Sequence, residues 1–441
     1  MGSEMCIRDS FTIELFKSLN DRNIKYCVLR NYESLPNNTG GSDLDLWVSS
    51  QDIKKVSEIL RETSIVTNCK IVSFIPSKHS PKFCFQNSKE GIQIDLFYGN
   101  IYFQNKVIFD ENTIEQHIKL YNGIAILNDN FANLVSLIKE IINNGTCTTK
   151  YTLPIYNSPC YDLDFLKLNL KAFNLEFIRT LYQAIQNHNI ENDCRILFQL
   201  SRKSLSAHIV INKIKKINRI FNKKPGYVIA ILGTDGSGKS TIINNITPIL
   251  NGGFHNGIIY NHLRPNFIPD LGIVLGKKEK TEEIKVVSNP HAEKQSGFLG
   301  SIIRWGYYMI DYTFGYFKKV FPVILTKSKI FIFDRYYYDY YIDPKRAKIN
   351  LPIWILKIGE VFVPKPDLIL CLGGNPQKIY ERKPETSLEE VTRQTNELRK
   401  FCNSHKKTVW IDTCTDITIS TNLAMEAIYN MMSKRFSNFK F

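Results

Sequence analysis

The chain has 441 residues, about three times the length of a typical domain, so we expect two or three domains. With 43% hydrophobic and 22% charged residues, the composition excludes a wholly disordered chain, and the lack of a glycine period or a sustained heptad excludes collagen and coiled coil. The net charge of +15 suits polyanionic partners but by itself names none.

Two features bear on where the protein works. No run reaches the roughly 18 to 20 uncharged apolar residues that span a bilayer, because the nearest candidate, residues 299–325, is interrupted by Arg304, Asp311, Lys318 and Lys319. The ten cysteines form no C-x-x-C pair and the start of the chain has no secretory pattern, so we expect free thiols and a cytoplasmic protein without a transmembrane segment. Residues 1–10, MGSEMCIRDS, are interpreted as an artefactual adapter-derived sequence or a disordered leader.

The first half of the chain predicts an α+β domain over residues 11–120. Its apolar spacing indicates a helix at 11–23, a second helix ending near residue 61, and strands at 26–29, 44–48 and 92–97. From residue 114 to about 221 the pattern is mostly helical, with a polar loop near 144–160. We therefore predict a helical connector over residues 121–223.

The end of this connector is strongly basic. Residues 202–224 hold eight basic residues and no acid, with isoleucines at intervals between them. Such a segment is either a basic amphipathic helix that makes a peripheral contact with an anionic membrane, or a solvated connecting helix packed by its isoleucines. We favour the second interpretation.

After Gly226 the pattern becomes α/β. An uninterrupted apolar run at 227–232 is typical of a strand covered on both faces, and further strands are predicted at 329–333, 367–372 and 408–411, with helices between them. This alternation predicts a C-terminal domain over residues 224–441 that is built on a parallel sheet with flanking helices.

A phosphate-binding loop follows the first of these strands. The motif G-x-x-x-x-G-K-[ST] lies between the strand and a predicted helix at 242–250. Glycines let backbone N–H groups turn toward phosphate oxygens, the lysine reaches the β- and γ-phosphates, and the following serine can bind Mg²⁺. The loop predicts ATP and Mg²⁺ as cofactors, and its residues are Gly233, Thr234, Asp235, Gly236, Ser237, Gly238, Lys239, Ser240 and Thr241.

The acidic third residue of this loop, Asp235, gives a variant that resembles the thymidylate kinase family. Asp334-Arg335-Tyr336 matches the D-R-Y element of that family, and Arg382, beyond the next strand, matches the start of its lid helix. The resemblance covers residues 227–434. It implies a phosphotransferase in which Asp235 faces the acceptor, Lys239 and Arg382 hold the transferring phosphoryl group, Asp334 acts near Mg²⁺ or as a base, and Arg335 holds an anionic group of the acceptor.

The chain departs from this family on the acceptor side. Where the family has an R-E-P-G-type segment, this chain has His262-Leu263-Arg264-Pro265, and a tyrosine-rich run occupies residues 336–341. These aromatic side chains either stack on a base or sugar ring or pack a helix. The acceptor is therefore predicted to be a nucleoside monophosphate or a sugar or polyol.

A second candidate site lies near the start of the chain. Asp43 and Asp45 are two residues apart on a predicted strand and share a face, and Asp95 lies on another strand. Three such carboxylates can hold Mg²⁺ for nucleotidyl transfer. The region resembles the nucleotidyltransferase fold, although Arg30-Asn31 stands where that family has a Gly-Ser pair. An Asp-x-Asp in a turn without any metal is the alternative.

The sequence thus predicts an ATP- and Mg²⁺-dependent phosphotransferase that transfers the γ-phosphoryl group to a small-molecule acceptor. Pairing of the two domain types resembles proteins of bacterial surface-polysaccharide gene clusters, which implies a sugar or polyol acceptor. The alternatives are an ATP-binding switch, and a nucleotidyltransferase acting through Asp43, Asp45 and Asp95. No nucleic-acid-reading module is recognised, so we expect no nucleic acid partner.

Overall fold

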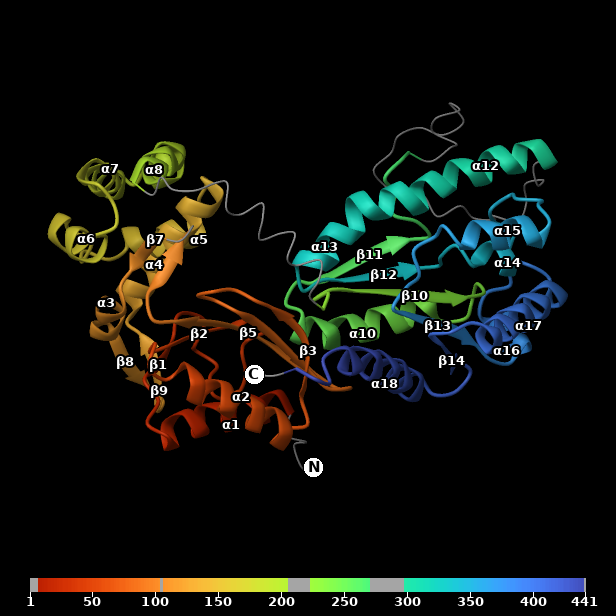
Figure 1. The fold of residues 1–441 in the computed structure, drawn as a ribbon, viewed down its shortest axis with the longest axis horizontal. Helices are drawn as coiled ribbons and strands as arrows, with labels where there is room; N and C mark the ends of the chain where they lie inside the picture. The colour runs from red at the N-terminus through yellow and green to blue at the C-terminus, as the bar shows by residue number, and fades with distance from the viewer. Residues whose placement is uncertain (1–6, 104–105, 205–222, 270–296, 440–441) are drawn as a thin grey trace.

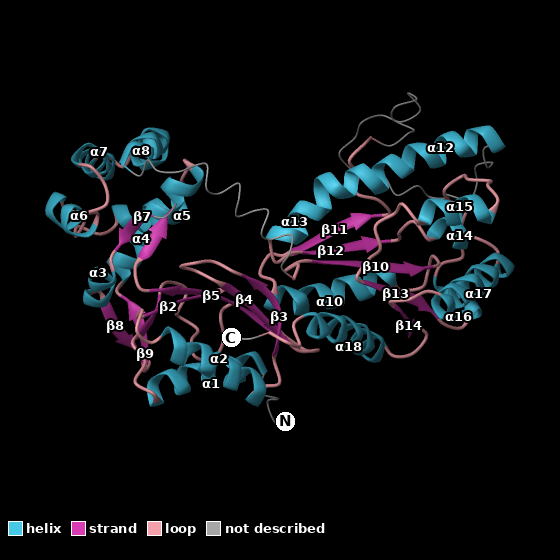
Figure 2. Cartoon of the chain, in the orientation of Figure 1, coloured by secondary structure: helices cyan, strands magenta, loops and turns pink. Residues whose placement is uncertain are grey.

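A computed structural model of the chain describes residues 7–103, 106–204, 223–269 and 297–439. Two α/β units lie side by side, one formed by the first half of the chain and one by the second (Figures 1 and 2). Most of the predicted basic segment at 202–224, residues 205–222, lies outside the described residues. Helix α1 (Ile7–Asp21) begins inside the stretch that was predicted to be a leader, so residues 7–10 are helical.

The N-terminal unit is built on a mixed seven-stranded sheet in the order β3-β4-β5-β2-β1-β9-β8. Its strands are β1 (Tyr26–Val28), β2 (Leu44–Val48), β3 (Lys70–Ile75), β4 (Lys82–Gln86), β5 (Gly91–Tyr98), β8 (Ile118–Tyr121) and β9 (Ile124–Leu127). Strands β6 (Ile101–Phe103) and β7 (Lys106–Phe109) form a separate hairpin. Helices α1 and α2 (Ile53–Val66) pack against alternate residues of the strands, such as Leu44, Leu46 and Val48 of β2, and together they form a large apolar core. The unit combines helices with a sheet, as predicted, while its likeness to nucleotidyltransferases stays a prediction.

The described part of the predicted connector, residues 121–204, belongs to this unit. Helix α3 (Glu111–Gln116) precedes β8, and the helices that follow the sheet are α4 (Asp129–Asn144), α5 (Thr149–Tyr156), α6 (Leu163–Asn169), α7 (Leu175–Gln186) and α8 (Ile190–Ser204). The long helices α4, α7 and α8 share one buried core with Leu29 of the sheet region and with Trp47 of β2. These helices are therefore a layer on the N-terminal sheet.

The expectation of helix from residue 114 onward is wrong at 118–127. There β8 and β9 form an antiparallel hairpin, and β9 pairs with β1, so the sheet continues past the predicted boundary at residue 120. The turn is Asn122-Gly123, with φ of 48° and 76°. Positive φ at both central residues is the conformation that Asn-Gly adopts in tight hairpins, and this local preference outweighs the helical apolar spacing.

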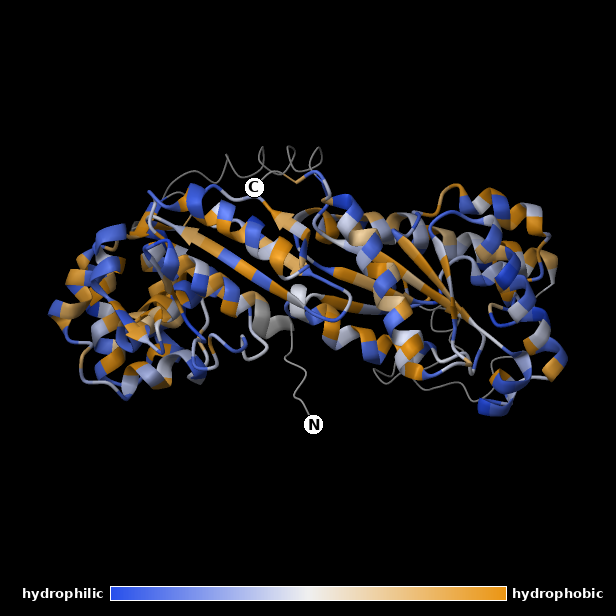
Figure 3. Cartoon of the chain, turned by 90° about the horizontal axis from the view of Figure 1, so that it is seen from below, coloured by the Kyte–Doolittle hydropathy of each residue, from blue (hydrophilic) through white to orange (hydrophobic). Residues whose placement is uncertain are grey.

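The C-terminal unit has a five-stranded parallel sheet in the order β11-β12-β10-β13-β14. The strands are β10 (Tyr227–Gly233), β11 (Ile258–His262), β12 (Ile330–Asp334), β13 (Leu368–Gly373) and β14 (Thr408–Asp412). All residues of β10, β12 and β13 are buried, and the strands of this sheet are coloured mainly as hydrophobic in Figure 3. A parallel sheet with helices on both faces requires such continuous apolar runs.

Alternate residues of β10 enter two different cores. Tyr227, Ile229 and Ile231 pack with α10 (Lys239–Gly253) and α18 (Ile417–Arg435). The intervening residues pack on the opposite face. That face and the carboxyl edge are covered by α12 (Phe298–Ile310), the π-helical η2 (Asp311–Val320), α13 (Phe321–Thr326), α14 (Asp339–Ile342), α15 (Ile353–Glu360), α16 (Pro376–Arg382) and α17 (Leu388–Ser404).

The two units share one apolar core. Residues of β3, β4 and β5 pack against α10 and α18, and all belong to the same buried cluster. Ser73 Oγ donates a hydrogen bond of 2.7 Å to Pro225 O, and Tyr227 OH donates to Val72 O. Because α10 is the helix that follows the phosphate-binding loop, the N-terminal sheet supports the C-terminal site directly.

Among the described helices, none is both long and apolar enough to cross a bilayer.

Candidate functional site

The phosphate-binding loop joins the carboxyl end of β10 to the start of α10. Gly236 and Gly238 have φ of 79° and 80°, a conformation that strains a residue with a side chain. A Cβ at Gly233 would lie 2.8 Å from Leu372 O and closer still to Ser237 Oγ. Each of these three glycines of the predicted motif is thus required by backbone conformation or by close packing.

Lys239 is buried within this loop. Its ammonium donates hydrogen bonds to Gly233 O at 3.0 Å and to Thr234 O at 2.9 Å. Burial, together with the nearby Arg335 guanidinium, lowers the pKa of Lys239 to about 8, against the opposing effect of Asp334 and Asp235. The lysine is therefore held at the loop, with its charge sensitive to its surroundings.

The Asp235 carboxylate lies close to three cationic side chains of the site. Its carboxylate accepts hydrogen bonds from Arg335 Nη2 at 2.7 Å and Arg346 Nη2 at 2.9 Å, and Lys239 Nζ lies 4.0 Å away. Burial alone would raise the pKa of Asp235, but the charges of Arg335, Lys239 and Arg346 lower it to about 2. One carboxylate thus holds three cations beside the loop.

Arg335 is directed toward the loop by its backbone. Its φ is 72°, unusual for a residue with a side chain, and its N–H donates to Ile231 O at 2.9 Å. The buried guanidinium also donates to Asp339 Oδ2 at 2.7 Å. Two carboxylates therefore hold the Arg335 guanidinium in place, and their contacts accompany a backbone conformation that is unfavourable for a residue with a side chain.

Asp334, the last residue of β12, faces the neighbouring edge strand β11. Tyr260 OH donates to Asp334 Oδ2 at 3.0 Å, and His262 Nδ1 lies 3.6 Å from the same oxygen. Burial would raise the pKa of Asp334, but the adjacent His262 imidazole and the charges of Lys239 and Arg335 lower it to about 2. Its Oδ1 is buried and accepts no hydrogen bond from the described residues.

These residues surround one pocket of about 690 Å³, which we call the phosphate pocket. Most of the predicted site residues line it: Asp235, Gly236, Gly238, Lys239, Ser240, Thr241, Asp334, Arg335 and Arg382. Gly233 and Ser237 lie in the same loop without lining the pocket. Arg382, at the end of α16, donates to Thr413 O at 2.9 Å.

Sequence reasoning missed several lining residues. Tyr260, His262, Arg346 and Thr413 line the phosphate pocket but were not predicted as site residues. Arg346 lies in the basic Lys345-Arg346 pair after the tyrosine run, yet nothing in the spacing brings it to a loop 111 residues earlier. Tyr260 and His262 lie two apart on a short edge strand, a weak signal on its own.

Two further features of the predicted acceptor side, Arg264 and the tyrosine run at 336–341, have structural roles. Arg264 Nη1 donates to the buried Asp311 at 2.6 Å and to Ile268 O at 3.1 Å. The tyrosines of residues 336–341 are mostly buried in the core on the far face of the parallel sheet. Of the two interpretations of this run, the structure therefore favours packing.

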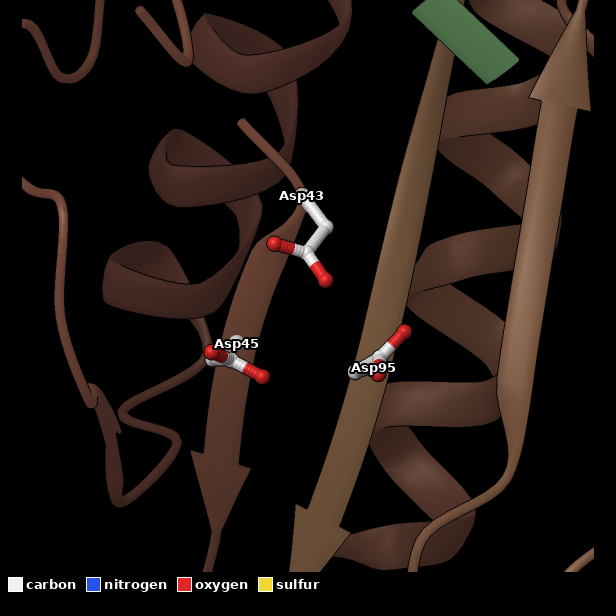
Figure 4. A group of neighbouring side chains, drawn as sticks. All are labelled: Asp43, Asp45 and Asp95. Carbon is white, nitrogen blue, oxygen red and sulfur yellow. The ribbon is translucent and has the colours of Figure 1, made fainter. Parts of the chain in front are cut away.

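The predicted N-terminal triad also comes together. Asp45 on β2 lies directly opposite Asp95 on β5, and Asp43 precedes them on the same side (Figure 4). One carboxylate oxygen from each lies within 4.8 Å of the other two. Three converging oxygen donors fit the ligand preference of Mg²⁺.

Cations already accompany this triad. Arg30 donates to Asp45 and lies 3.8 Å from Asp43, while Lys82 Nζ lies 2.9 Å from Asp95. Burial nevertheless outweighs Lys82 and raises the pKa of Asp95 to about 6. The adjoining cavity, lined by Arg30, Asp45 and Tyr151, has a volume of about 100 Å³, below the 300 to 1,000 Å³ typical of small-molecule pockets.

Comparisons with known proteins give little beyond this geometry. No protein-family model matches the chain, and no curated protein matches it. Among solved structures, the thymidylate kinase from Ehrlichia chaffeensis is similar over 46% of this chain and 98% of its own, with 14% sequence identity and a TM-score of 0.31. A likeness at that score supports no argument about activity. The structure itself has a mixed α/β arrangement, in which a five-stranded parallel sheet is flanked by helices.

Proposed function

We propose that the chain is an ATP- and Mg²⁺-dependent kinase that uses the phosphate pocket. The observation that carries this proposal is the convergence of five cations, Lys239, Arg335, Arg346, Arg382 and Lys383, on one pocket at a helix N-terminus. Phosphoryl transfer depends mainly on positioning and on neutralising the charge of the γ-phosphoryl oxygens, and such a set of groups supplies both.

The residues of the phosphate pocket have different roles in this proposal. The loop N–H groups and Lys239 bind the β- and γ-phosphates, and Arg346 and Arg382 neutralise the transferring group. Ser240 offers an oxygen donor that would hold Mg²⁺, and the ion would supply positive charge that offsets the charge of the phosphates. Asp235, which holds three cations, yields them to the phosphates when ATP binds.

The transfer itself needs one oxygen of the acceptor. That oxygen forms a bond to the γ-phosphorus, the bond between the γ-phosphorus and the β–γ bridging oxygen breaks, and ADP leaves. If the acceptor is a hydroxyl, its proton passes to the Asp334 carboxylate, which its low pKa keeps ionised. If the acceptor is a nucleoside monophosphate, its phosphate oxygen carries no such proton.

Nucleotidyl transfer at Asp43, Asp45 and Asp95 is the second candidate, supported by the convergence of their oxygens. Arg30 and Lys82 offset two of the three negative charges, and the adjoining cavity is small for a nucleoside triphosphate. Kinase activity at the phosphate pocket is therefore the better supported proposal.

The test is incubation of the full chain with γ-labelled ATP, Mg²⁺ and a panel of nucleoside monophosphates, sugars and polyols. We expect label transfer by the wild type and a loss of at least 100-fold in Lys239→Ala, because one charged contact to the transferring group is removed. Asp45→Ala serves as the comparison. Transfer that survives Lys239→Ala but is lost in Asp45→Ala would contradict the kinase proposal and support the N-terminal site.

A further inference from the structure

A second pocket adjoins the phosphate pocket. It has a volume of about 490 Å³ and lies between α10 and the edge strand β11. Ser240 and Tyr260 line both pockets. Because the kinase proposal leaves the second pocket without a role, its chemistry bears on the identity of the acceptor.

The described residues that line this pocket are uncharged, and most of them are polar. Six residues supply hydroxyl or amide groups, and the remainder of the lining is isoleucine. We call it the asparagine pocket, and its polar residues are Ser240, Asn244, Thr247, Asn251, Asn256 and Tyr260. The contrast with the phosphate pocket is sharp, because five cations and two carboxylates line that cavity.

The polar groups form a row on one face of α10. Ser240, Asn244, Thr247 and Asn251 are spaced by four, three and four residues, which places them on one side of the helix. At 1.5 Å per residue the row is about 16 Å long, enough for a ligand larger than a single small ion. It begins at the phosphate-binding loop and leads away from it.

Two of these groups retain hydrogen-bonding capacity. Asn251 Oδ1 is buried and accepts no hydrogen bond from the described residues. Thr247 Oγ1 donates to Ile243 O at 2.6 Å, so its lone pairs remain able to accept. Amides and hydroxyls of this kind pair well with ligand hydroxyls, which both donate and accept.

Tyr260 links the two pockets chemically. Half of its side chain is exposed, and its hydroxyl donates to Asp334 Oδ2. A ligand in the asparagine pocket that extends past Tyr260 therefore reaches the residue that receives the proton in the proposed reaction. The buried Asp334 Oδ1 has no hydrogen-bond partner among the described residues and is suited to accept from a hydroxyl.

We infer that the asparagine pocket binds the acceptor, and that the acceptor is an uncharged polyhydroxylated compound of the sugar or polyol class. This inference rests on the proposed kinase function and adds the substrate class to it. A phosphate-bearing acceptor would meet no lysine or arginine among the described residues that line this pocket. Within the described part of the chain, a nucleobase would meet a single aromatic ring of the lining, that of Tyr260.

The test uses the full chain with D-glucose, N-acetyl-D-glucosamine, ribitol and glycerol as neutral probes, and with thymidine and dTMP for comparison. Label transfer from ATP and calorimetric binding of each compound are both measured. We expect transfer to at least one neutral probe, with Asn251→Leu and Thr247→Val each raising its KM about tenfold, since each variant removes a hydrogen-bonding partner. The affinity for ATP should change less than twofold.

Asn245→Leu is the matched control. It makes the same substitution on the same helix, but Asn245 bonds to Thr421 Oγ1 on α18 and lines neither pocket. Its KM for the neutral probe should equal that of the wild type. An equal rise in KM in all three variants, or no rise in the two pocket variants, would overturn the inference.

The outcomes separate this inference from the kinase proposal. Transfer to dTMP or thymidine alone would support the kinase proposal and overturn the inference that the acceptor is a sugar or polyol. Binding of a neutral probe that Asn251→Leu abolishes, without transfer to any compound, would support the pocket and overturn the kinase. Neither binding nor transfer of any probe would overturn both.

Discussion

Lys239 is a buried ammonium group whose charge depends on pH within the accessible range. Burial and the Arg335 guanidinium lower its pKa to about 8, so the proton is lost as the pH rises through 8. Only the protonated form attracts phosphate strongly, and bound phosphate in turn favours protonation. The affinity for ATP is thus linked to proton uptake at this residue.

We therefore expect the affinity of the wild type for ATP to fall about tenfold between pH 7 and pH 9, because roughly one lysine in ten stays charged one unit above its pKa. Lys239→Arg keeps its charge throughout this range, so its affinity should stay flat. Titration with a fluorescent ATP analogue at several pH values measures both. Parallel slopes in the two proteins would show that Lys239 is not the titrating group.

Single residues differ in how far the sequence reveals them. Lys239 and the loop glycines could be predicted because their motif is local and each residue type has a fixed physical task. Arg346 and Tyr260 could not, because their contacts with Asp235 and Asp334 arise only when distant segments meet at the carboxyl edge of the sheet. Tertiary contacts of this kind leave no mark on local spacing.

At the scale of elements, the start of β5 meets the end of α10 with almost no space between their backbones. A Cβ at Gly91 would lie 2.7 Å from Gly253 N, and a Cβ at Gly253 would lie 3.0 Å from Phe85 O. Gln86 Nε2 donates to Ile249 O across the same junction at 3.4 Å. Two glycines thus let the N-terminal sheet support the helix of the phosphate-binding loop.

We expect Gly91→Ala to lower the free energy of unfolding by about 1 to 3 kcal/mol, because the added methyl group displaces the backbone of α10. Gly306→Ala is the control. A Cβ there meets nothing within 4 Å, and alanine favours the helix α12, so this variant should be neutral or up to about 1 kcal/mol more stable. Urea denaturation measures both, and equal midpoints would contradict the close approach.

The elements themselves were predictable where apolar runs were long. Strands β10, β12 and β13 are buried on both faces and carry continuous apolar sequence, so their positions were expected to within a residue. The edge strand β11 has only exposed or half-buried residues, and its five residues give no comparable signal. The β8–β9 hairpin was missed because a single Asn-Gly turn decides it.

At the scale of the whole molecule, no local pattern could reveal that the two α/β units share a core. Residues from β3 to β5 and from α10 and α18 belong to one buried cluster, which includes Phe83, Phe85, Leu250 and Met432. Phe439, near the end of the chain, packs edge-to-face on Phe74 of β3 with ring centroids 4.8 Å apart. Removing either unit would expose this apolar surface of the other, so the two should unfold together.

We expect a single calorimetric unfolding transition, and ATP should shift all of it. Ligand at a hundredfold excess over its dissociation constant stabilises the folded chain by about 2.7 kcal/mol, and a shared core transmits this stabilisation to both units. Hydrogen exchange of the β4–β5 amides should therefore slow in parallel with that of β10, although the phosphate pocket lies in the other unit. Lys239→Ala should keep the single transition and lose the shift. Two transitions, of which ATP moves one, would mean that the packing of the sheet on α10 and α18 is too weak to couple the units.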